Sequence, residues 1–200
     1  MVNEMAGSGA AAPGQVVLAG LSNGAFFARR AWVQSDREGS PWWLAPPARP
    51  AVHAACVPLM GTSDRNVPYA GGRPRGLPSW LAARRIRSIL THSSGREVVA
   101  AEDVCRDWAE VNASGAFGPA RVIAAEADGG LPVERLAAEA EGAPPDILYR
   151  IVGGGHAWPG GMPSAPQMVF GRISRALDAT GAVLDFARAA VQGPSGRAHP

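Results

Sequence analysis

The sequence contains no lysine, and all 19 basic residues of the 200-residue chain are arginine. Seventeen acidic residues oppose them, which leaves a formal net charge of +2 at pH 7. So close a balance excludes the strongly basic surface that is typical of nucleic-acid-binding proteins, and it gives no signal for an acidic partner. We therefore expect no nucleic acid among the partners.

Cysteine is also scarce, and long apolar runs are missing. Cys56 and Cys105 are too few for a disulfide framework, and each is interpreted as a small buried residue. No apolar run approaches the roughly 20 residues of a membrane-spanning helix, and residues 1–14 lack the segments of a signal peptide. Neither a His/Cys cluster with metal-ligand spacing nor a glycine-rich phosphate loop is present, so no metal and no cofactor are expected.

Apolar residues make up 46% of the chain, which is enough for one globular domain. We expect this domain to span residues 1–192, followed by a polar tail over 193–200. Short apolar runs alternate with stretches of helical spacing, which predicts an α/β fold with a mostly parallel sheet. The predicted strands are 16–19 and 147–152, and the predicted helices are 25–32, 81–90, 102–111 and 173–191. Residues 133–140 fit a strand or a helix, and residues 35–50 contain too much proline for either a regular helix or a central strand.

A serine stands between two glycines in Gly20-Leu21-Ser22-Asn23-Gly24, at the end of the first predicted strand. In a G-x-S-x-G turn between a strand and a helix, the serine is held in a strained conformation that exposes its Oγ above the sheet. The backbone N–H of the next residue, Asn23, then points at a developing oxyanion. Taken alone, the pattern fits a tight packing turn as well as it fits a nucleophile.

A serine nucleophile needs an adjacent base, and His156 is the best candidate among the four histidines. It lies in Gly-Gly-Gly-His-Ala-Trp-Pro-Gly-Gly, residues 153–161, directly after the last predicted strand. Three glycines allow a sharp turn, so we expect the imidazole at the carboxyl edge of the sheet. His53 near the proline-rich stretch, His92 after a predicted helix and His199 in the tail fit structural or solvated roles better.

Asp64 is the candidate acid that would orient this imidazole. It follows the apolar run 52–60 and lies in a loop, residues 61–76, that is rich in glycine and proline. A carboxylate that orients a catalytic histidine lies on a neighbouring strand-end loop, and Asp64 has such a place. The chain order Ser22, Asp64, His156 is the order found in α/β-hydrolases.

The segments GLSNG (20–24), GTSDRNVPYAGG (61–72) and GGGHAWPGG (153–161) follow one another in this chain. Together they resemble the polyhydroxybutyrate-depolymerase-like esterases, which include feruloyl and acetylxylan esterases. The resemblance implies an α/β-hydrolase fold with Ser22 as nucleophile, Asp64 as orienting acid and His156 as base. It also implies secretion, and a substrate with hydroxyalkanoate, feruloyl or acetyl ester bonds. Trp158 is a candidate for the acyl pocket, with a packed loop aromatic as the alternative.

The chain departs from that family in four respects. It starts just before the nucleophile strand, so we expect an incomplete α/β-hydrolase domain without the early strands and without the loop that gives the second oxyanion donor. Residues 35–50 differ from the strand that the family has there, and Met60 replaces a usual histidine. A family cysteine is also missing, because Ala113-Ser114 stand where Gly-Cys is expected.

Three functional hypotheses remain open at this point. The first is a serine esterase that works through an acyl-enzyme on Ser22. The second is a catalytically impaired, truncated remnant of such an esterase. The third is a serine peptidase or another acyl hydrolase of the same fold, because one fold supports many chemistries.

Overall fold

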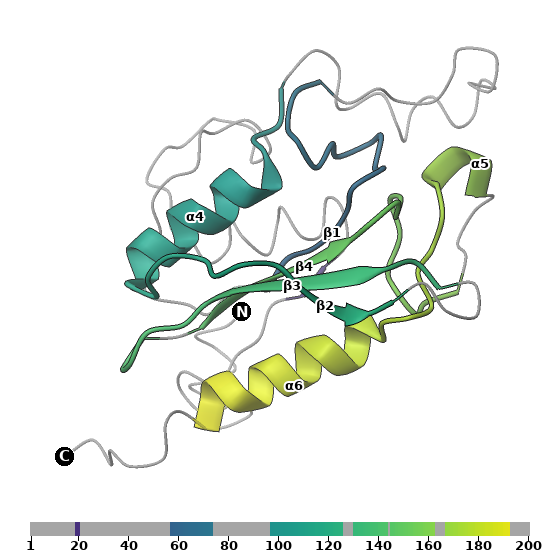
Figure 1. The fold of residues 1–200 in the computed structure, drawn as a ribbon. Coiled ribbons are helices and arrows are strands. Elements are labelled where there is room, and N and C mark those ends of the chain that lie inside the picture. Colours follow the sequence, from purple (N-terminus) through teal and green to yellow (C-terminus); the bar gives the residue numbers. More distant parts are fainter. Residues whose placement is uncertain are drawn as a thin grey trace, which may run out of the picture.

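The computed structural model describes residues 19–20, 57–73, 97–125, 130–143, 145–162 and 167–192. The proline-rich stretch 35–50 and the predicted helices 25–32 and 81–90 lie outside the described residues, as does the predicted strand 16–19 except for Ala19. Figure 1 shows the described part as a sheet with the helix α4 on one side and the helix α6 on the other.

Four described strands form one sheet in the order β1-β4-β3-β2. They are β1 (Leu59–Gly61), β2 (Arg121–Ala124), β3 (Val133–Ala138) and β4 (Asp146–Ile151). β1 runs parallel to β4, whereas β3 is antiparallel to both β4 and β2. The strand predicted at 147–152 is confirmed with bounds one residue earlier, and the ambiguous segment 133–140 contains a strand.

The described part of the sheet is mixed, which differs from the mostly parallel sheet that the sequence predicts. The physical reason is the length of the connections. Residues 125–132 join β2 to β3, and residues 139–145 join β3 to β4. Both are shorter than the dozen or more residues that a crossover between parallel strands needs, so the strands reverse direction instead. The partial α/β-hydrolase fold stays a prediction.

The apolar core of the described part lies where β3 and β4 meet the segment before α6. Leu131, Val133 and Ile151 are buried together, and partly buried apolar side chains pack against them: Leu59, Ala124, Tyr149, Ala176 and Leu177. Val133 and Ile151 are direct partners across the antiparallel pair β3–β4, so the strand register places these two buried side chains next to each other. The core includes Ile151, the last residue of β4, and the candidate base His156 lies in the loop that follows this strand.

The helix α4 (Ala101–Asn112) confirms the helix predicted at 102–111. Cys105, Trp108, Ala109 and Asn112 are buried, and their spacing of three and four residues defines one helical face. Glu102 and Asp103 lie in the first turn, where negative charge interacts favourably with the helix dipole. α4 packs on β4.

The helix α6 (Ala179–Gln192) begins six residues later than the predicted 173–191. Asp178 explains the shift, because its carboxylate accepts a hydrogen bond from the Thr180 N–H at 3.0 Å and its carbonyl accepts the Ala182 N–H at 2.9 Å. Aspartate is a favoured residue before the first helical turn. In the segment before α6, the Ser174 carbonyl accepts a hydrogen bond from the Gly160 N–H of the histidine-containing loop, at 2.8 Å.

The side chains of β4 point alternately to the two faces of the sheet, and their contacts show that α4 and α6 lie on opposite faces. Asp146 and Arg150 bond to side chains of α4, whereas Ile147 and Tyr149 line a pocket beneath α6. Since successive strand residues point to opposite faces, the two helices cover the two sides. Figure 1 shows the same arrangement.

Candidate active site

Two loops meet at the carboxyl edge of the parallel pair β1 and β4. The acid loop, residues 62–73, follows β1, and the histidine loop, residues 152–162, follows β4. Parallel neighbours end at the same edge of a sheet, which is where ligands bind in open α/β sheets. The topology therefore brings the candidate acid and the candidate base together.

Asp64 and His156 form a hydrogen-bonded pair. The carboxylate Oδ2 of Asp64 lies 2.7 Å from Nδ1 of His156, and the side chains are only 7% and 10% exposed, respectively. An ionised carboxylate can only accept, so Nδ1 is assigned as the donor and Nε2 remains as the acceptor. This is the tautomer in which a histidine can take a proton from a hydroxyl group.

The second oxygen of the Asp64 carboxylate is held by its own loop. Oδ1 accepts hydrogen bonds from the backbone N–H groups of Asn66, at 2.7 Å, and Val67, at 2.9 Å. This is a turn in which an aspartate side chain bonds the backbone two and three residues further along. The acid loop thus holds one carboxylate oxygen of Asp64, and His156 contacts the other.

Backbone contacts join the acid loop to the histidine loop. The Thr62 N–H donates to the Ile151 carbonyl at 3.0 Å, the Ser63 N–H donates to the Gly154 carbonyl at 2.8 Å, and the Gly153 N–H donates to Thr62 Oγ1 at 2.8 Å. Gly153 has a φ of +76°, which makes the sharp turn that three glycines predict.

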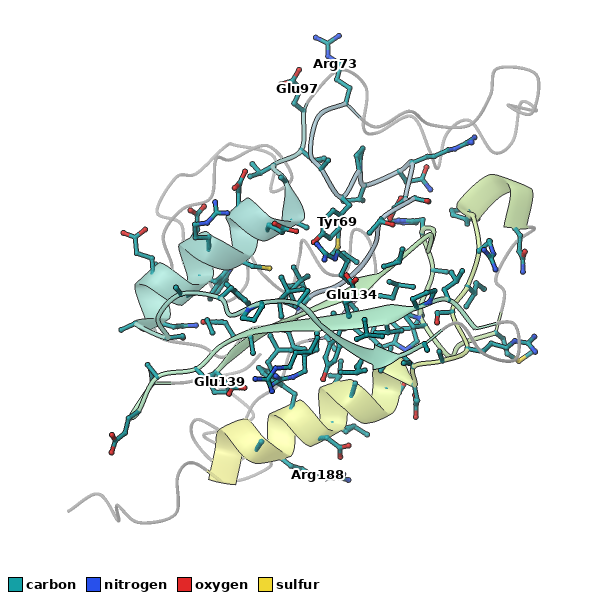
Figure 2. The ribbon with its side chains drawn as sticks, in the orientation of Figure 1. Tyr69, Arg73, Glu97, Glu134, Glu139 and Arg188 are labelled. Atoms are coloured by element: carbon teal, nitrogen blue, oxygen red, sulfur yellow. The ribbon has the colours of Figure 1, made fainter. Side chains whose placement is uncertain are left out.

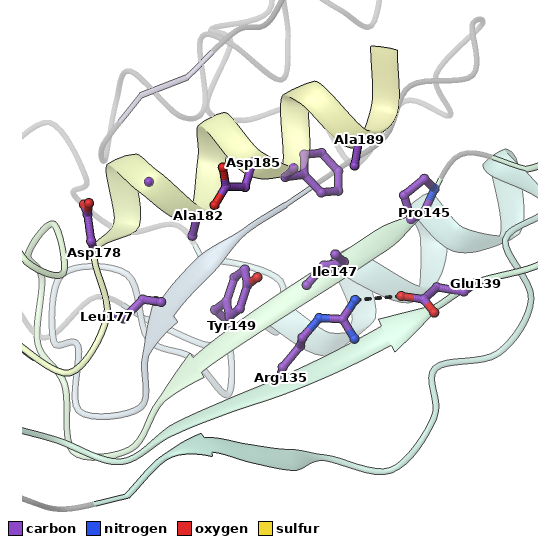
Figure 3. Close-up of a pocket in the computed structure, with 12 residues that line it drawn as sticks. Arg135, Glu139, Pro145, Ile147, Tyr149, Leu177, Asp178, Ala182, Asp185 and Ala189 are labelled. Carbon is purple, nitrogen blue, oxygen red and sulfur yellow. Dashed lines mark hydrogen bonds and ion pairs between the residues drawn. The ribbon is translucent and has the colours of Figure 1, made fainter. Parts of the chain in front are cut away.

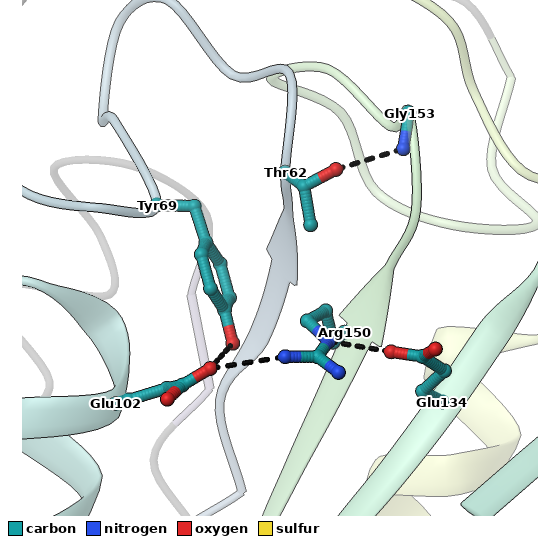
Figure 4. A network of polar contacts seen from close by, with 6 residues as sticks. All are labelled: Thr62, Tyr69, Glu102, Glu134, Arg150 and Gly153. Atoms are coloured by element: carbon teal, nitrogen blue, oxygen red, sulfur yellow. Dashed lines mark hydrogen bonds and ion pairs between the residues drawn. The ribbon is translucent and has the colours of Figure 1, made fainter. Parts of the chain in front are cut away.

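A polar network ties the acid loop to α4 and the sheet (Figure 4). The Tyr69 hydroxyl donates to Glu102 Oε1 at 2.7 Å, and Arg150 donates to the same oxygen at 3.0 Å and to Glu134 at 2.5 Å. Burial, followed by the hydrogen bond to Glu102, raises the pKa of Tyr69. The phenol therefore stays protonated and acts as a donor.

The far end of the acid loop is anchored differently. Gly72 and Val98 exchange two backbone hydrogen bonds, of 2.9 and 2.8 Å. Arg73 and Glu97 lie 3.7 Å apart just beyond this bridge, and Figure 2 shows them projecting away from the sheet. So exposed a pair contributes little to stability.

Trp158 lies two residues after His156 in the histidine loop. Its indole Nε1–H donates to Thr180 Oγ1 at 3.0 Å, in the first turn of α6. The side chain is partly exposed, and its nitrogen is occupied by this contact. Its predicted place in an acyl pocket stays a prediction.

The predicted nucleophile Ser22 and the predicted oxyanion donor Asn23 lie outside the described residues. Among the predicted site residues, the structure brings Asp64 and His156 together and places Trp158 on the same loop as His156. Sequence reasoning missed Tyr69, whose hydroxyl bonds to Glu102 on α4, and Phe170, whose ring stacks on His156. Tyr69 lies within the motif at residues 61–72, but the motif assigned it no role, and Phe170 lies in none of the three motifs.

A shallow pocket of about 620 Å³ lies elsewhere, between α6 and the strands β3 and β4 (Figure 3). Its lining includes Tyr149, Asp178, Phe186 and the ion pair of Arg135 with Glu139, at 2.6 Å. Neither Asp64 nor His156 lines it. The pocket is therefore separate from the Asp64–His156 pair, the candidate acid–base pair.

Within the described ranges, no group of three or more His, Cys, Asp or Glu side chains is arranged to hold a metal ion. None of the helices described has the length and apolarity to cross a membrane. Comparison of the chain with protein-family models, with curated proteins and with solved structures finds no match. The resemblance to the esterase family thus rests on sequence motifs alone.

Proposed function

We propose that this chain is a serine hydrolase of carboxylic ester bonds, built on part of an α/β-hydrolase fold. The observation that carries the proposal is the 2.7 Å contact between Asp64 Oδ2 and His156 Nδ1 at the carboxyl edge of β1 and β4. Two residues 92 positions apart in the chain are joined in the geometry that a triad requires. The G-x-S-x-G segment at Ser22 supplies the third member.

The mechanism follows from the role of Nε2 as the acceptor nitrogen of the imidazole. Nε2 of His156 accepts the proton of Ser22 Oγ as that oxygen attacks the ester carbonyl, and Asp64 stabilises the imidazolium that forms. The Asn23 N–H stabilises the oxyanion. The imidazolium then protonates the departing alcohol, and water, deprotonated by the same nitrogen, releases the acid and restores Ser22.

The substrate class comes from the motif resemblance. We propose hydroxyalkanoate, feruloyl or acetyl esters, acted on outside the cell, with Trp158 beside the acyl group. Because its nitrogen is bonded to Thr180, the indole would offer the substrate its ring rather than its N–H.

Steady-state hydrolysis of a panel of substrates tests this function. The panel comprises p-nitrophenyl acetate, a feruloyl ester, a hydroxybutyrate oligomer and a peptide anilide. We expect ester hydrolysis that falls by at least about 10⁴-fold in S22A and H156Q and by about 10⁴-fold in D64N. S63A is the matched control, because Ser63 is exposed and lies next to Asp64, and it should retain activity.

Three outcomes would contradict the proposal. Ester hydrolysis that survives S22A places the chemistry at another site. A preference for the anilide favours a peptidase. Folded protein with no hydrolysis at all favours a catalytically impaired remnant.

A further inference from the structure

Residues 170–172 run alongside the histidine loop and bond to it. The His156 N–H donates to the Phe170 carbonyl at 2.5 Å, and the Gly155 N–H donates to the Arg172 carbonyl at 2.9 Å. Gly154 and Arg172 form a parallel bridge. The backbone that carries the imidazole is thus paired with the end of the short helix α5 (Gln167–Phe170) and the residues that follow it.

Two glycines permit this close pairing. A Cβ on Gly155 would overlap the Phe170 carbonyl oxygen, and a Cβ on Gly171 would lie 2.8 Å from the Gly155 Cα. Gly171 also has a φ of +83°. The segment therefore approaches the histidine loop more closely than side chains at these positions would allow.

The Phe170 ring lies against the imidazole that the backbone contact has brought near. The ring centroids of His156 and Phe170 are 5.9 Å apart, and the ring planes differ by 24°. Offset stacking at such distances is a favourable arrangement of aromatic rings. Asp64 fixes one edge of the imidazole, at Nδ1, and Phe170 lies against its face.

We infer that Phe170 is a positioning residue that holds the His156 ring in the plane where Nδ1 faces Asp64 and Nε2 faces the nucleophile. The imidazole rotates about its Cβ–Cγ bond, and the hydrogen bond at Nδ1 restrains this rotation through a single contact. A ring stacked on the face opposes this rotation. The inference rests on the proposed function for its catalytic consequence, but the ring position itself is measurable without activity.

The imidazole tautomer is the measurement that isolates the ring position. Long-range ¹H–¹⁵N NMR of the full chain at mildly alkaline pH distinguishes a neutral ring protonated at Nδ1 from one protonated at Nε2. H156Q identifies the signal. We expect the Nδ1–H form in the wild type and in F170Y, and a mixture of both forms in F170A.

Kinetics supply the second readout. We expect F170A to lower kcat on p-nitrophenyl acetate by about 10- to 100-fold, with KM changed less than about twofold, because a misplaced catalytic group loses alignment rather than binding. F170Y, which keeps the ring, should restore most of kcat.

F117A is the matched control. Phe117 is a partly buried loop phenylalanine next to Gly118, whose N–H bonds to Ala137. Ala137 pairs with Ile147 at the start of β4, whereas His156 follows the end of that strand. F117A should therefore preserve both the tautomer and kcat.

Two results would overturn the inference. An unchanged tautomer in F170A means that Asp64 alone holds the ring. An equal change in F117A means that general loss of packing accounts for the effect. A wild type with the Nδ1–H tautomer but without esterase activity would contradict the proposed function instead, and the tautomer comparison would still decide the role of Phe170.

Discussion

At the scale of single residues, Asp64 uses both of its oxygens. One is bonded to two backbone N–H groups of its own loop, and the other meets His156. The carboxylate is therefore held on both of its oxygens, an arrangement that would preorganise the pair for the proposed reaction. Such preorganisation lowers the cost of aligning a base with a nucleophile.

Tyr69 leads to a prediction about alkaline pH. Burial and the hydrogen bond to Glu102 raise the pKa of its phenol, so the unfolded chain loses this proton at a lower pH than the folded chain. The stability that results is complete below about pH 10, the ordinary tyrosine value, and is lost as pH rises toward the folded value.

We therefore expect thermal unfolding to show a larger fall in Tm between about pH 8 and about pH 10.5 for the wild type than for Y69F. The chain has only two tyrosines, so Y149F leaves Tyr69 as the sole phenol for absorbance titration. Ionisation of that phenol at the ordinary value, or equal Tm losses in both proteins, would refute the role given to its burial.

At this scale, sequence reasoning predicted the placement of Asp64 and His156, and their catalytic roles stay predictions. The segments around Asp64 and His156 placed both residues after strands, and those strands are neighbours. Tyr69 and Phe170 were missed because their roles come from contacts with Glu102 and His156. Such side-chain contacts between distant segments leave no local pattern.

At the scale of elements, the histidine loop depends on close backbone approach. A methyl group on Gly155 would meet the Phe170 carbonyl and the Gly171 Cα. Both are backbone atoms, which cannot move aside as the end of a flexible side chain can. The paired segments would have to separate.

We expect G155A to lower the free energy of unfolding by about 1–3 kcal/mol, as overpacking does, and to lower kcat as well. G118A is its control, because a Cβ there would lie 3.7 Å from the nearest atom, the Ala137 carbonyl oxygen, at an ordinary contact distance. Denaturant unfolding of both variants measures the difference. A G155A protein as stable as G118A would contradict the pairing of the two segments.

Helices and strands with strong local patterns were predicted well, and weak ones were not. α4 and β4 fall within one residue of their predicted bounds. α6 begins late because Asp178 caps it, although the apolar spacing continues upstream. β2 was not predicted, because its four residues, Arg-Val-Ile-Ala, do not alternate between apolar and polar side chains. In the structure they are mostly exposed.

At the scale of the whole molecule, the described sheet carries two distinct regions, one at its edge and one on its face. The acid–base pair lies at the carboxyl edge of β1 and β4, and the shallow pocket lies on the face covered by α6. β2 forms the other end of the sheet as described, with Val122 63% and Ile123 48% exposed. Exposed apolar residues on such a strand favour association between sheets.

Strand direction was the part of the overall fold that sequence alone could not supply. Alternating elements suggest parallel strands, but the short connections around β3 force reversal. The predicted nucleophile Ser22 lies outside the described residues, so the proposed triad depends on a residue that the described part of the chain does not include.

Covalent labelling of Ser22 is the most direct test of the central claim. The folded full chain is treated with a fluorophosphonate probe, and the modified residue is located by mass spectrometry, with S22A and S63A as comparisons. The account predicts one label on Ser22 that disappears in S22A, slows strongly in H156Q and persists in S63A. Folded protein that takes up no label at Ser22, or that labels equally well in H156Q, would contradict it.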